Sequence, residues 1–211
     1  MMDKENIILC FCKHPEAGLV KSRLAKDIGN EHASVIYKIL LDEILNNTSH
    51  SGFKTFLYCY PDTNHPTLKQ YRDKYSIILK KQSDGDLGTK MYHAMKDHLN
   101  ENKNKNIILI GTDCLEIDAA YIQQALNQLN SGKEVVLGPT EDGGYALIGA
   151  NKIDASIFQN IEWSSEIVLE QTVGRINELN LKYAELPMVR DLDTYKDYQY
   201  FSTHEKYCHL F

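Results

Sequence analysis

The sequence lacks the short signatures of several enzyme classes. Its five cysteines include no C-x-x-C pair, and its eight histidines form neither H-x-x-x-H nor H-E-x-x-H, so neither a structural zinc site nor a zinc hydrolase is expected. The G-x-S-x-G turn of hydrolases with a serine nucleophile is missing too. So are G-x-x-x-x-G-K-[ST] and G-x-G-x-x-G, which excludes the two commonest phosphate-binding loops.

Long apolar runs and an excess of positive charge are also lacking. The first strongly apolar run, Ile7–Cys12, is too short to span a bilayer and does not have the layout of a signal peptide. The 23 basic residues are outnumbered by 29 acidic ones, for a net charge of -6, whereas nucleic-acid binders favour the opposite balance. We therefore expect a cytoplasmic protein without a membrane span or a nucleic-acid partner; a protein partner stays open.

What the sequence does contain is the alternation of an α/β domain. The 211 residues, 43% hydrophobic and 25% charged, suffice for one domain over 1–211. Apolar runs between amphipathic stretches predict a mostly parallel mixed sheet with helices on both faces. The expected strands are Ile7–Cys12, Lys54–Tyr60, Ile77–Lys80, Asn106–Gly111, Val135–Gly138, Tyr145–Gly149 and Leu181–Leu186. The expected helices are His32–Asn46, Gly88–Leu99, Asp118–Leu129, Ser165–Leu179 and one capped by Thr194.

The segment after the first expected strand concentrates positive charge. Ligands of such sheets bind beyond the carboxyl ends of the strands, where Lys13, Gly18, Lys21 and Arg23 follow one another. A glycine-containing loop with three cations, entering a helix, suits a diphosphate. A solvated basic helix start is the alternative.

An aspartate follows the expected strand Asn106–Gly111. Asp113 at the end of a buried strand needs a partner, and a Mg2+ or Mn2+ ion bound to substrate phosphates would provide one. A helix cap is the alternative role. Further along the chain, Asp191 and Asp193 alternate, so one of them could complete a metal site with Asp113; acids at a helix start are the other interpretation.

A glycine-rich turn joins the strands Val135–Gly138 and Tyr145–Gly149. Gly143 and Gly144 allow a close backbone approach to a ligand, and Asp142 could accept hydrogen bonds from sugar hydroxyls. An ordinary hairpin turn is the alternative. Trp163, the single tryptophan, is expected to pack in the core or line a pocket.

Six ordered blocks carry a family resemblance over nearly the whole chain. They are FCKHPEAGLVKSRLA, QSDGDLGTKM, GTDCLEI, LGPTEDGGYALIG, IEWSSEIVLEQT and RDLDTYKD. Together they resemble the radical-SAM/selenodomain-associated transferase family, a GT-A-like branch of the nucleotide-diphospho-sugar transferases. The chain departs from the family pattern at Ser22, Leu115, Ser165 and Tyr195.

The resemblance implies a Rossmann-like GT-A domain and roles for single residues. It implies that the base binds near the first strand and the phosphates near Lys13, Lys21 and Arg23. Asp113 would be a metal ligand, and Asp191 or Asp193 would serve a second metal. Residues from Asp142 to Tyr145 would face the sugar or the acceptor. Gln82 and Asp86 would lie at the rim of the pocket.

Three functions remain open from the sequence. The first is a metal-dependent glycosyltransferase with a nucleotide-sugar donor and a small-molecule acceptor, in which Asp113 holds Mg2+ or Mn2+ while Lys21 and Arg23 stabilise the leaving diphosphate. The second is a nucleotidyltransferase that joins a nucleoside triphosphate to a phosphorylated small molecule and releases pyrophosphate; the loop from Lys13 to Leu24 is similar to that of 2-phospholactate guanylyltransferases. The third is a nucleotide-binding protein without catalysis.

Overall fold

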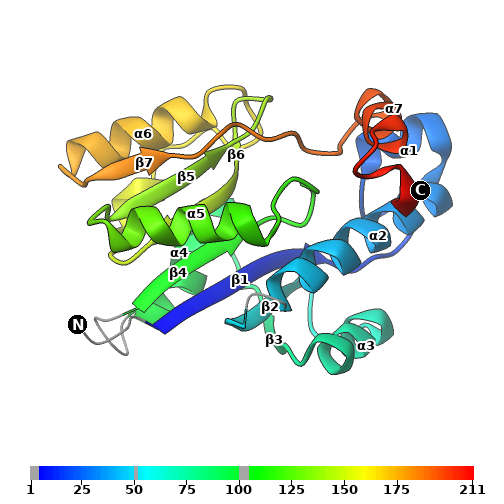
Figure 1. Cartoon of the computed structure of the whole chain (residues 1–211), viewed down its shortest axis with the longest axis horizontal. Coiled ribbons are helices and arrows are strands. Elements are labelled where there is room, and N and C mark those ends of the chain that lie inside the picture. Colours follow the sequence, from blue (N-terminus) through cyan, green and yellow to red (C-terminus); the bar gives the residue numbers. More distant parts are fainter. Residues whose placement is uncertain (1–4, 50–51, 100–104) are drawn as a thin grey trace.

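A seven-stranded sheet runs through the centre of the molecule. The computed structural model describes residues 5–49, 52–99 and 105–211 (Figure 1). Within them the sheet order is β3-β2-β1-β4-β6-β5-β7, and β6 alone runs antiparallel to its two neighbours. This confirms the predicted mostly parallel mixed sheet. The strands are β1 (Glu5–Lys13), β2 (Lys54–Tyr60), β3 (Ile78–Lys81), β4 (Lys105–Ile110), β5 (Val135–Pro139), β6 (Tyr145–Ala150) and β7 (Tyr183–Glu185).

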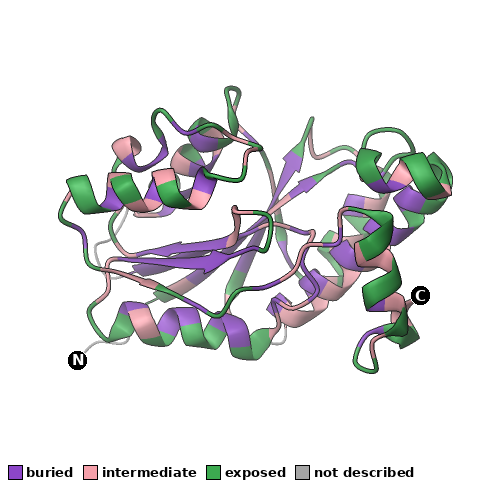
Figure 2. Ribbon diagram, turned by 90° about the horizontal axis from the view of Figure 1, so that it is seen from above, coloured by how far each residue is buried: buried purple, intermediate pink, exposed green. Residues whose placement is uncertain are grey.

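Helices cover both faces of the sheet. One face packs against α2 (Asn30–Ser49), α3 (Pro66–Tyr75) and α5 (Ala119–Asn130), and the other against α4 (Leu87–Leu99), η1 (Ala155–Phe158) and α6 (Val168–Glu178). The central strands are buried almost throughout, whereas the edge strands β3 and β7 are partly exposed and the helices are buried along one side only (Figure 2). Burial on both faces explains why β1 and β4 are continuous apolar runs rather than alternating ones.

Besides the hydrophobic layers on the two faces of the sheet, a smaller cluster of buried hydrophobic residues lies at one end of it. The short helix α1 (Ser22–Ile28) and the C-terminal helix α7 (Tyr195–Thr203) lie side by side there, next to α2 (Figure 1). Leu24 and Phe201 are fully buried between them, together with Leu115 and Leu192. The C-terminal segment, which ends in η2 (Cys208–Leu210), is thus packed against the beginning of the chain.

The switch in strand order lies between β1 and β4. The chain moves outward from β1 to β2 and β3 and then returns to place β4 on the other side of β1. The segments that leave the carboxyl ends of β1 and β4 therefore diverge at one point of the sheet edge, where ligands of such folds bind. Because β6 is antiparallel, its first residue, Tyr145, lies at this edge as well.

Two helices were not delimited from the sequence. Helix α1, whose start was expected after the loop that follows the first strand, has seven residues, too few to display a period. Lys21 precedes it, and the Lys21 side chain caps nothing. Helix α3 buries only Leu68, so it lacks an apolar stripe, although His65 caps it and Pro66 opens it. No helix of the described residues is long and apolar enough to cross a membrane.

Two cysteines of β1, Cys10 and Cys12, face the same side of the sheet. Cys10 and Cys12 are both buried in the cluster under α2 and α5, and both are free thiols. Burial raises the pKa of Cys10 to about 12 and raises that of Cys12 as well. They are therefore unreactive core residues at neutral pH.

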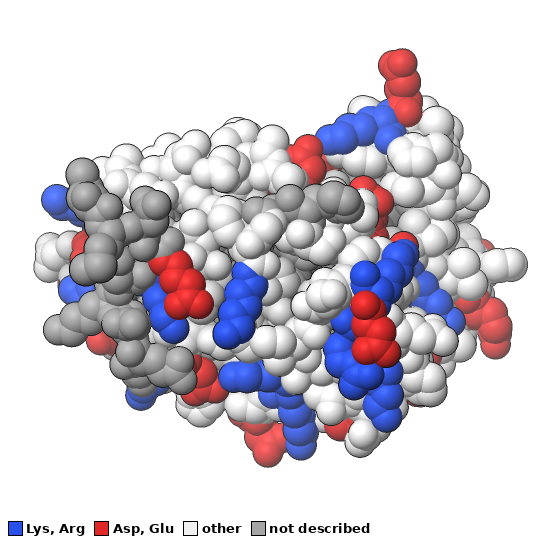
Figure 3. Space-filling model, turned by 60° about the horizontal axis from the view of Figure 1, so that its bottom comes forward, with Lys and Arg blue, Asp and Glu red and all other residues white. Residues whose placement is uncertain are grey.

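On the surface, charges of both signs are interspersed. The face in Figure 3 carries Asp and Glu side chains between its Lys and Arg side chains. The exclusion of nucleic acid nevertheless rests on the overall charge of -6 and stays a prediction.

Candidate active site

A cavity of about 1340 Å³ opens at the carboxyl edge of the sheet. It is lined by the end of β1 with the start of α1, the start of α4, the segment after β4, and the β5–β6 turn together with the segment before α6. The segment before α7 and the ends of β2 and β3 also contribute to the lining. Cations and carboxylates meet in it. The lining cations are Lys13, Lys21, Arg23 and Lys90, and the lining carboxylates are Asp113, Glu141, Asp142, Glu166, Asp191 and Asp193.

The floor of the cavity holds a buried ion-pair triad formed by Lys21, Asp113 and Asp193. The Lys21 Nζ lies 2.5 Å from Asp113 Oδ1 and 3.0 Å from Asp193 Oδ1. Its side chain is 2% exposed, whereas the aspartates are 47% and 37% exposed. Burial alone would lower the pKa of Lys21, but the two carboxylates outweigh burial and raise it, so the ammonium stays charged.

The backbone holds the two aspartates together independently of Lys21. The amide of Leu192 donates a hydrogen bond of 2.8 Å to the carbonyl oxygen of Asp113. The amide of Asp193 donates to Asp197 Oδ2 at 3.2 Å, inside the capping box that starts α7. The sequence placed Asp191 or Asp193 in a shared metal site with Asp113 because of their residue type and alternation; the backbone contacts that join the two segments have no local sequence signal.

Asp191 adds a third carboxylate beside the triad. Its burial, followed by the negative charges of Asp113, Asp193 and Asp142, raises its pKa to about 8. Asp142, in the β5–β6 turn, lines the same cavity. The structure thus places both Asp191 and Asp193 in one cavity with Asp113, whereas the sequence called for one of them to join it.

The β5–β6 turn is held by its own aspartate. Asp142 Oδ1 accepts hydrogen bonds from Thr140 Oγ1 at 2.6 Å and from the Gly144 amide at 3.1 Å. Gly143 has φ +86°, and a Cβ there would overlap the backbone carbonyl of Glu166. The segment is thus a hairpin turn, and it also makes the close backbone approach that the sequence allowed. The neighbour that approaches Gly143, however, is the segment before α6 and not a ligand.

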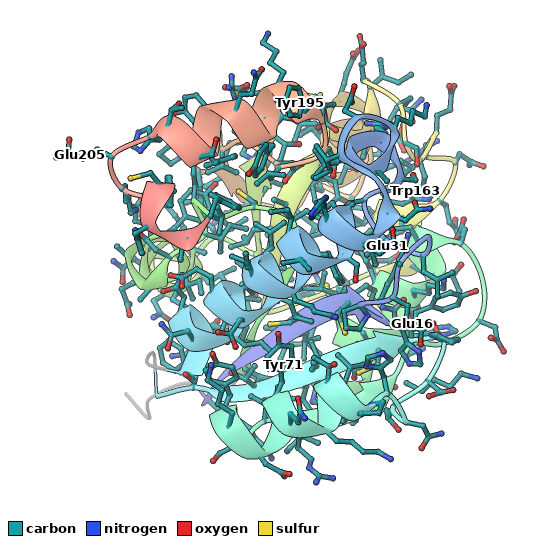
Figure 4. The ribbon with its side chains drawn as sticks, turned by 90° about the vertical axis from the view of Figure 1, so that its right-hand side faces the viewer. Glu16, Glu31, Tyr71, Trp163, Tyr195 and Glu205 are labelled. Atoms are coloured by element: carbon teal, nitrogen blue, oxygen red, sulfur yellow. The ribbon has the colours of Figure 1, made fainter. Side chains whose placement is uncertain are left out.

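Two aromatic rings line the side of the cavity next to this turn. Tyr145 opens β6, and Trp163 lies between η1 and α6, on the side of the molecule where α1 lies (Figure 4). The indole Nε1 of Trp163 is buried without a hydrogen-bond partner among the described residues. Trp163 also touches the position of Gly88, where a Cβ would collide with its ring.

Gln82 presents one fixed polar atom to the side of the cavity opposite these two rings. Its Nε2 donates hydrogen bonds to the carbonyl oxygens of Cys12 at 3.0 Å and Tyr58 at 2.9 Å. Both amide hydrogens are therefore used, and Oε1 is left as an acceptor at the cavity. Tyr60 and Lys90 flank this region, with the Lys90 ammonium 4.7 Å from the centre of the Tyr60 ring.

Two of the predicted binding residues lie apart from the cavity lining. Gly18 has φ +84° and shapes the exposed loop after β1. Asp86 caps α4 by accepting a hydrogen bond of 2.8 Å from the Thr89 amide. Sequence reasoning in turn missed Lys90 and Tyr60, because neither lies in a segment with a recognisable phosphate-binding pattern.

The donor set of the floor fits a hard divalent cation. Among the described residues no group of three or more His, Cys, Asp or Glu side chains stands ready to hold a metal. Mg2+, however, commonly binds one or two protein carboxylates and takes its remaining ligands from substrate phosphates and water. Asp113 and Asp193 already direct two carboxylate oxygens at one cationic atom, Lys21 Nζ, so the residues suit such an ion.

Comparison with solved structures places this site in a known fold. A protein from Desulfovibrio desulfuricans G20, provisionally assigned as a nucleotide-diphospho-sugar transferase, is 27% identical with a TM-score of 0.86, over 97% of this chain and 93% of that one. A cytidylyltransferase from Leptospira borgpetersenii is 16% identical, with a TM-score of 0.55 over 93% of this chain and 84% of that one. Glucosyl-3-phosphoglycerate synthase from Mycobacterium tuberculosis, in complex with Mn2+ and uridine diphosphate, is 7% identical, with a TM-score of 0.54 over 94% and 75%.

The structural neighbours are thus transferases of both the sugar-transferring and the nucleotidyl-transferring kind. Searching curated proteins gives no match. A family described as "Uncharacterized protein conserved in bacteria (DUF2064)" matches residues 44–165, which include Gln82, Asp113, Asp142 and Trp163. The chain therefore belongs to the DUF2064 family and has the fold of the nucleotide-diphospho-sugar transferases.

Proposed function

We propose that this protein is a metal-dependent glycosyltransferase that takes a nucleotide-sugar donor and transfers the sugar to a small-molecule acceptor. The observation that carries the proposal is the composition of the cavity at the carboxyl edge of the sheet. Its floor is the triad of Lys21, Asp113 and Asp193, one side carries cations, and the other side carries the aromatic and carboxylate groups that sugars favour. The narrower association with radical-SAM and selenodomain proteins stays a prediction from the sequence.

The diphosphate is assigned to the floor and the cationic side. Lys21 and Arg23 would neutralise charge on the leaving nucleoside diphosphate as the bond between the sugar C1 and the phosphate oxygen breaks. Asp113 and Asp193 would hold Mg2+ or Mn2+. When bound, that ion supplies Lewis-acid stabilisation of the diphosphate charge. Lys13, at the end of β1, adds a further cation to the same side.

The nucleoside and the sugar are assigned to opposite sides of the floor. The fixed Oε1 of Gln82 would accept a hydrogen bond from a base N–H. Asp142, Gly143, Gly144 and Tyr145 would face the sugar, with the free oxygen of Asp142 accepting from hydroxyl groups. The rings of Tyr145 and Trp163 would pack against the apolar face of the sugar.

Ligand-induced thermal stabilisation is the first test. Nucleotide-sugars and nucleoside triphosphates are each added with and without Mn2+, and a ligand at a hundred times its dissociation constant stabilises the fold by about 2.7 kcal/mol. A shift confined to nucleotide-sugars with metal supports the glycosyltransferase. A flat panel contradicts it and favours a protein that has kept the fold without catalysis.

A nucleotidyltransferase is the second candidate. It is favoured by the buried Lys21, because a cation fixed at the start of α1 is also suited to an in-line attack on an α-phosphate. The cytidylyltransferase neighbours share the fold but are too distant in sequence to decide. The released product separates the two reactions: a nucleoside diphosphate for sugar transfer, pyrophosphate for nucleotidyl transfer.

A further inference from the structure

Lys21 occupies the position that a divalent cation would need. Its ammonium lies between Asp113 Oδ1 and Asp193 Oδ1, at 2.5 and 3.0 Å, and these oxygens are the ones proposed above as metal ligands. Two cations cannot share the same pair of oxygens at those distances without strong repulsion. Metal binding to the ligand-free protein must therefore displace an ion pair that is already formed.

The local backbone positions Lys21 for this contact. The residue has φ 50° and ψ 43°, the left-handed region that is strained for a non-glycine residue, at the turn into α1. Its side chain is 2% exposed, so its amino group makes these contacts away from bulk water. Arg23, the other cation near Asp193, is 3.8 Å away and 59% exposed, and its contact is correspondingly weaker.

The carboxylates can keep their places when Lys21 leaves. The hydrogen bond between the Leu192 amide and the Asp113 carbonyl joins the two segments without any side chain of Lys21. Lysine, by contrast, has a flexible four-carbon stem that can redirect its ammonium by rotation alone. A diphosphate arriving in the cavity offers that ammonium new oxygen partners.

We propose that Lys21 is a built-in counter-ion that blocks the metal position until a diphosphate takes over its ammonium. The inference rests on the proposed assignment of diphosphate and metal to this floor. It makes metal and nucleotide bind cooperatively: the nucleotide removes the competing cation, and the metal releases Lys21 for the phosphates. By linkage each ligand raises the affinity of the other by the same factor.

The test measures Mn2+ binding to the nucleotide-free protein by the electron paramagnetic resonance of free Mn2+. Lys21→Met should bind Mn2+ at least about tenfold more tightly than the wild type, equivalent to about 1.4 kcal/mol. Lys90→Met is the matched control, because it removes the same charge from the same cavity while its ammonium lies over Tyr60. Equal affinities of the Lys21→Met and Lys90→Met variants would overturn the proposal.

Loss of a buried cation could unfold the Lys21→Met variant, so two further measurements accompany it. Lys21→Gln keeps a hydrogen-bond donor between the carboxylates and should show the same gain in Mn2+ affinity. In the wild type, a saturating nucleoside diphosphate should raise Mn2+ affinity at least about tenfold over that of the protein alone, after subtraction of Mn2+ bound by free nucleotide. A bound nucleotide that leaves the Mn2+ affinity unchanged also overturns the proposal.

The outcomes separate this inference from the proposed function. If no nucleotide binds, with or without Mn2+, the proposed function fails. The Mn2+ affinity of the Lys21→Met variant still tests whether Lys21 competes with the metal. If nucleotide and Mn2+ both bind but Lys21→Met gains nothing, the counter-ion fails and the proposed function stands.

Discussion

The two sides of the cavity are built by different means. On one side, Lys13, Lys21 and Arg23 follow directly from β1, a parallel strand whose position is fixed by β2 and β4. On the other, Asp142 and Trp163 belong to the β5–β6 turn and to the segment before α6, which lock onto each other through backbone contacts. The first side concentrates cations, and the second combines carboxylates with aromatic rings.

This difference suggests that the two sides of the cavity recognise different parts of the ligand. A cationic side recognises charge, which every nucleoside diphosphate carries, and so cannot discriminate finely among donors. A side made of a constrained turn and two rings recognises shape and the pattern of hydroxyl groups. Changes on the two sides should accordingly have different consequences for ligands with and without a sugar.

The largest effect is expected at the carboxylate floor. Asp113→Asn should lower turnover by about a thousandfold, or about 4 kcal/mol of transition-state stabilisation, because one ligand of the metal is lost. It should weaken metal-dependent binding of a nucleoside diphosphate and of a nucleotide-sugar alike. Both are measured by calorimetric titration with Mn2+ present.

Asp142→Asn is the matched variant on the other side. Asparagine keeps an oxygen for the Thr140 hydroxyl and the Gly144 amide, so the turn should survive. It should weaken the nucleotide-sugar by about tenfold and leave the nucleoside diphosphate unchanged. Equal losses for both ligands would show that the proposed division between the two sides is wrong.

Gly143→Ala should break the second side structurally. The added Cβ would overlap the Glu166 carbonyl in a backbone of φ +86°, and we expect a loss of about 3 kcal/mol in the free energy of unfolding. Chemical denaturation measures it. Gly132→Ala, with φ +101° and nothing within 4 Å of the new Cβ, should cost only about 1 kcal/mol. Similar losses in the two variants would mean that backbone conformation, not the close approach, matters at Gly143.

Tyr37→Phe should loosen the first side. The buried Tyr37 hydroxyl accepts from the Lys13 amide at 2.9 Å and lies 3.1 Å from Thr112 Oγ1, so its removal leaves polar atoms unpaired at a cost of about 2 kcal/mol. Thermal and denaturant unfolding report the loss. In Tyr71→Phe, which removes only a bond to the Lys38 carbonyl on the outer face, about 1 kcal/mol should be lost and nucleotide binding kept.

The smallest effect is expected for the ion pair at the rim. Arg190 Nε donates to Glu141 Oε2 at 2.8 Å, but Glu141 is 52% exposed, so Glu141→Gln should cost less than about 1 kcal/mol. High salt should remove what difference there is. A loss that persists in salt would reveal a contact between this rim and the second side that the ion pair does not explain.

Prediction from sequence succeeded where periodicity and strand ends determine position. All seven strands lie where apolar runs placed them, and α2, α4, α5, α6 and α7 lie where stripes or caps placed them, within a few residues at each end. Helix α6 begins at Val168 instead of Ser165, with Ile167 as its N-cap, and Ser164, with φ 68°, lies in the turn before it.

The sequence did not predict the positions of side chains that depend on contacts between distant segments. That Lys21 would lie between Asp113 and Asp193 depends on the docking of α7 beside α1, which no local pattern encodes. Asp86, which the family resemblance placed at the rim of the pocket, caps α4, since a carboxylate before a helix can satisfy its first amides without any ligand. The side-chain roles of Gln82 and Lys90 likewise depend on which carbonyls and rings they meet.

Lys21 and Asp193 are 172 positions apart in the sequence, which has a consequence for synthesis of the chain. The ribosome releases the loop after β1 long before Asp193, the carboxylate that completes the triad. Termination between Glu185 and Asp193 would leave all seven strands of the described sheet but no complete triad. Formation of the triad therefore reports that the segment leading into α7 has been made and has docked beside α1.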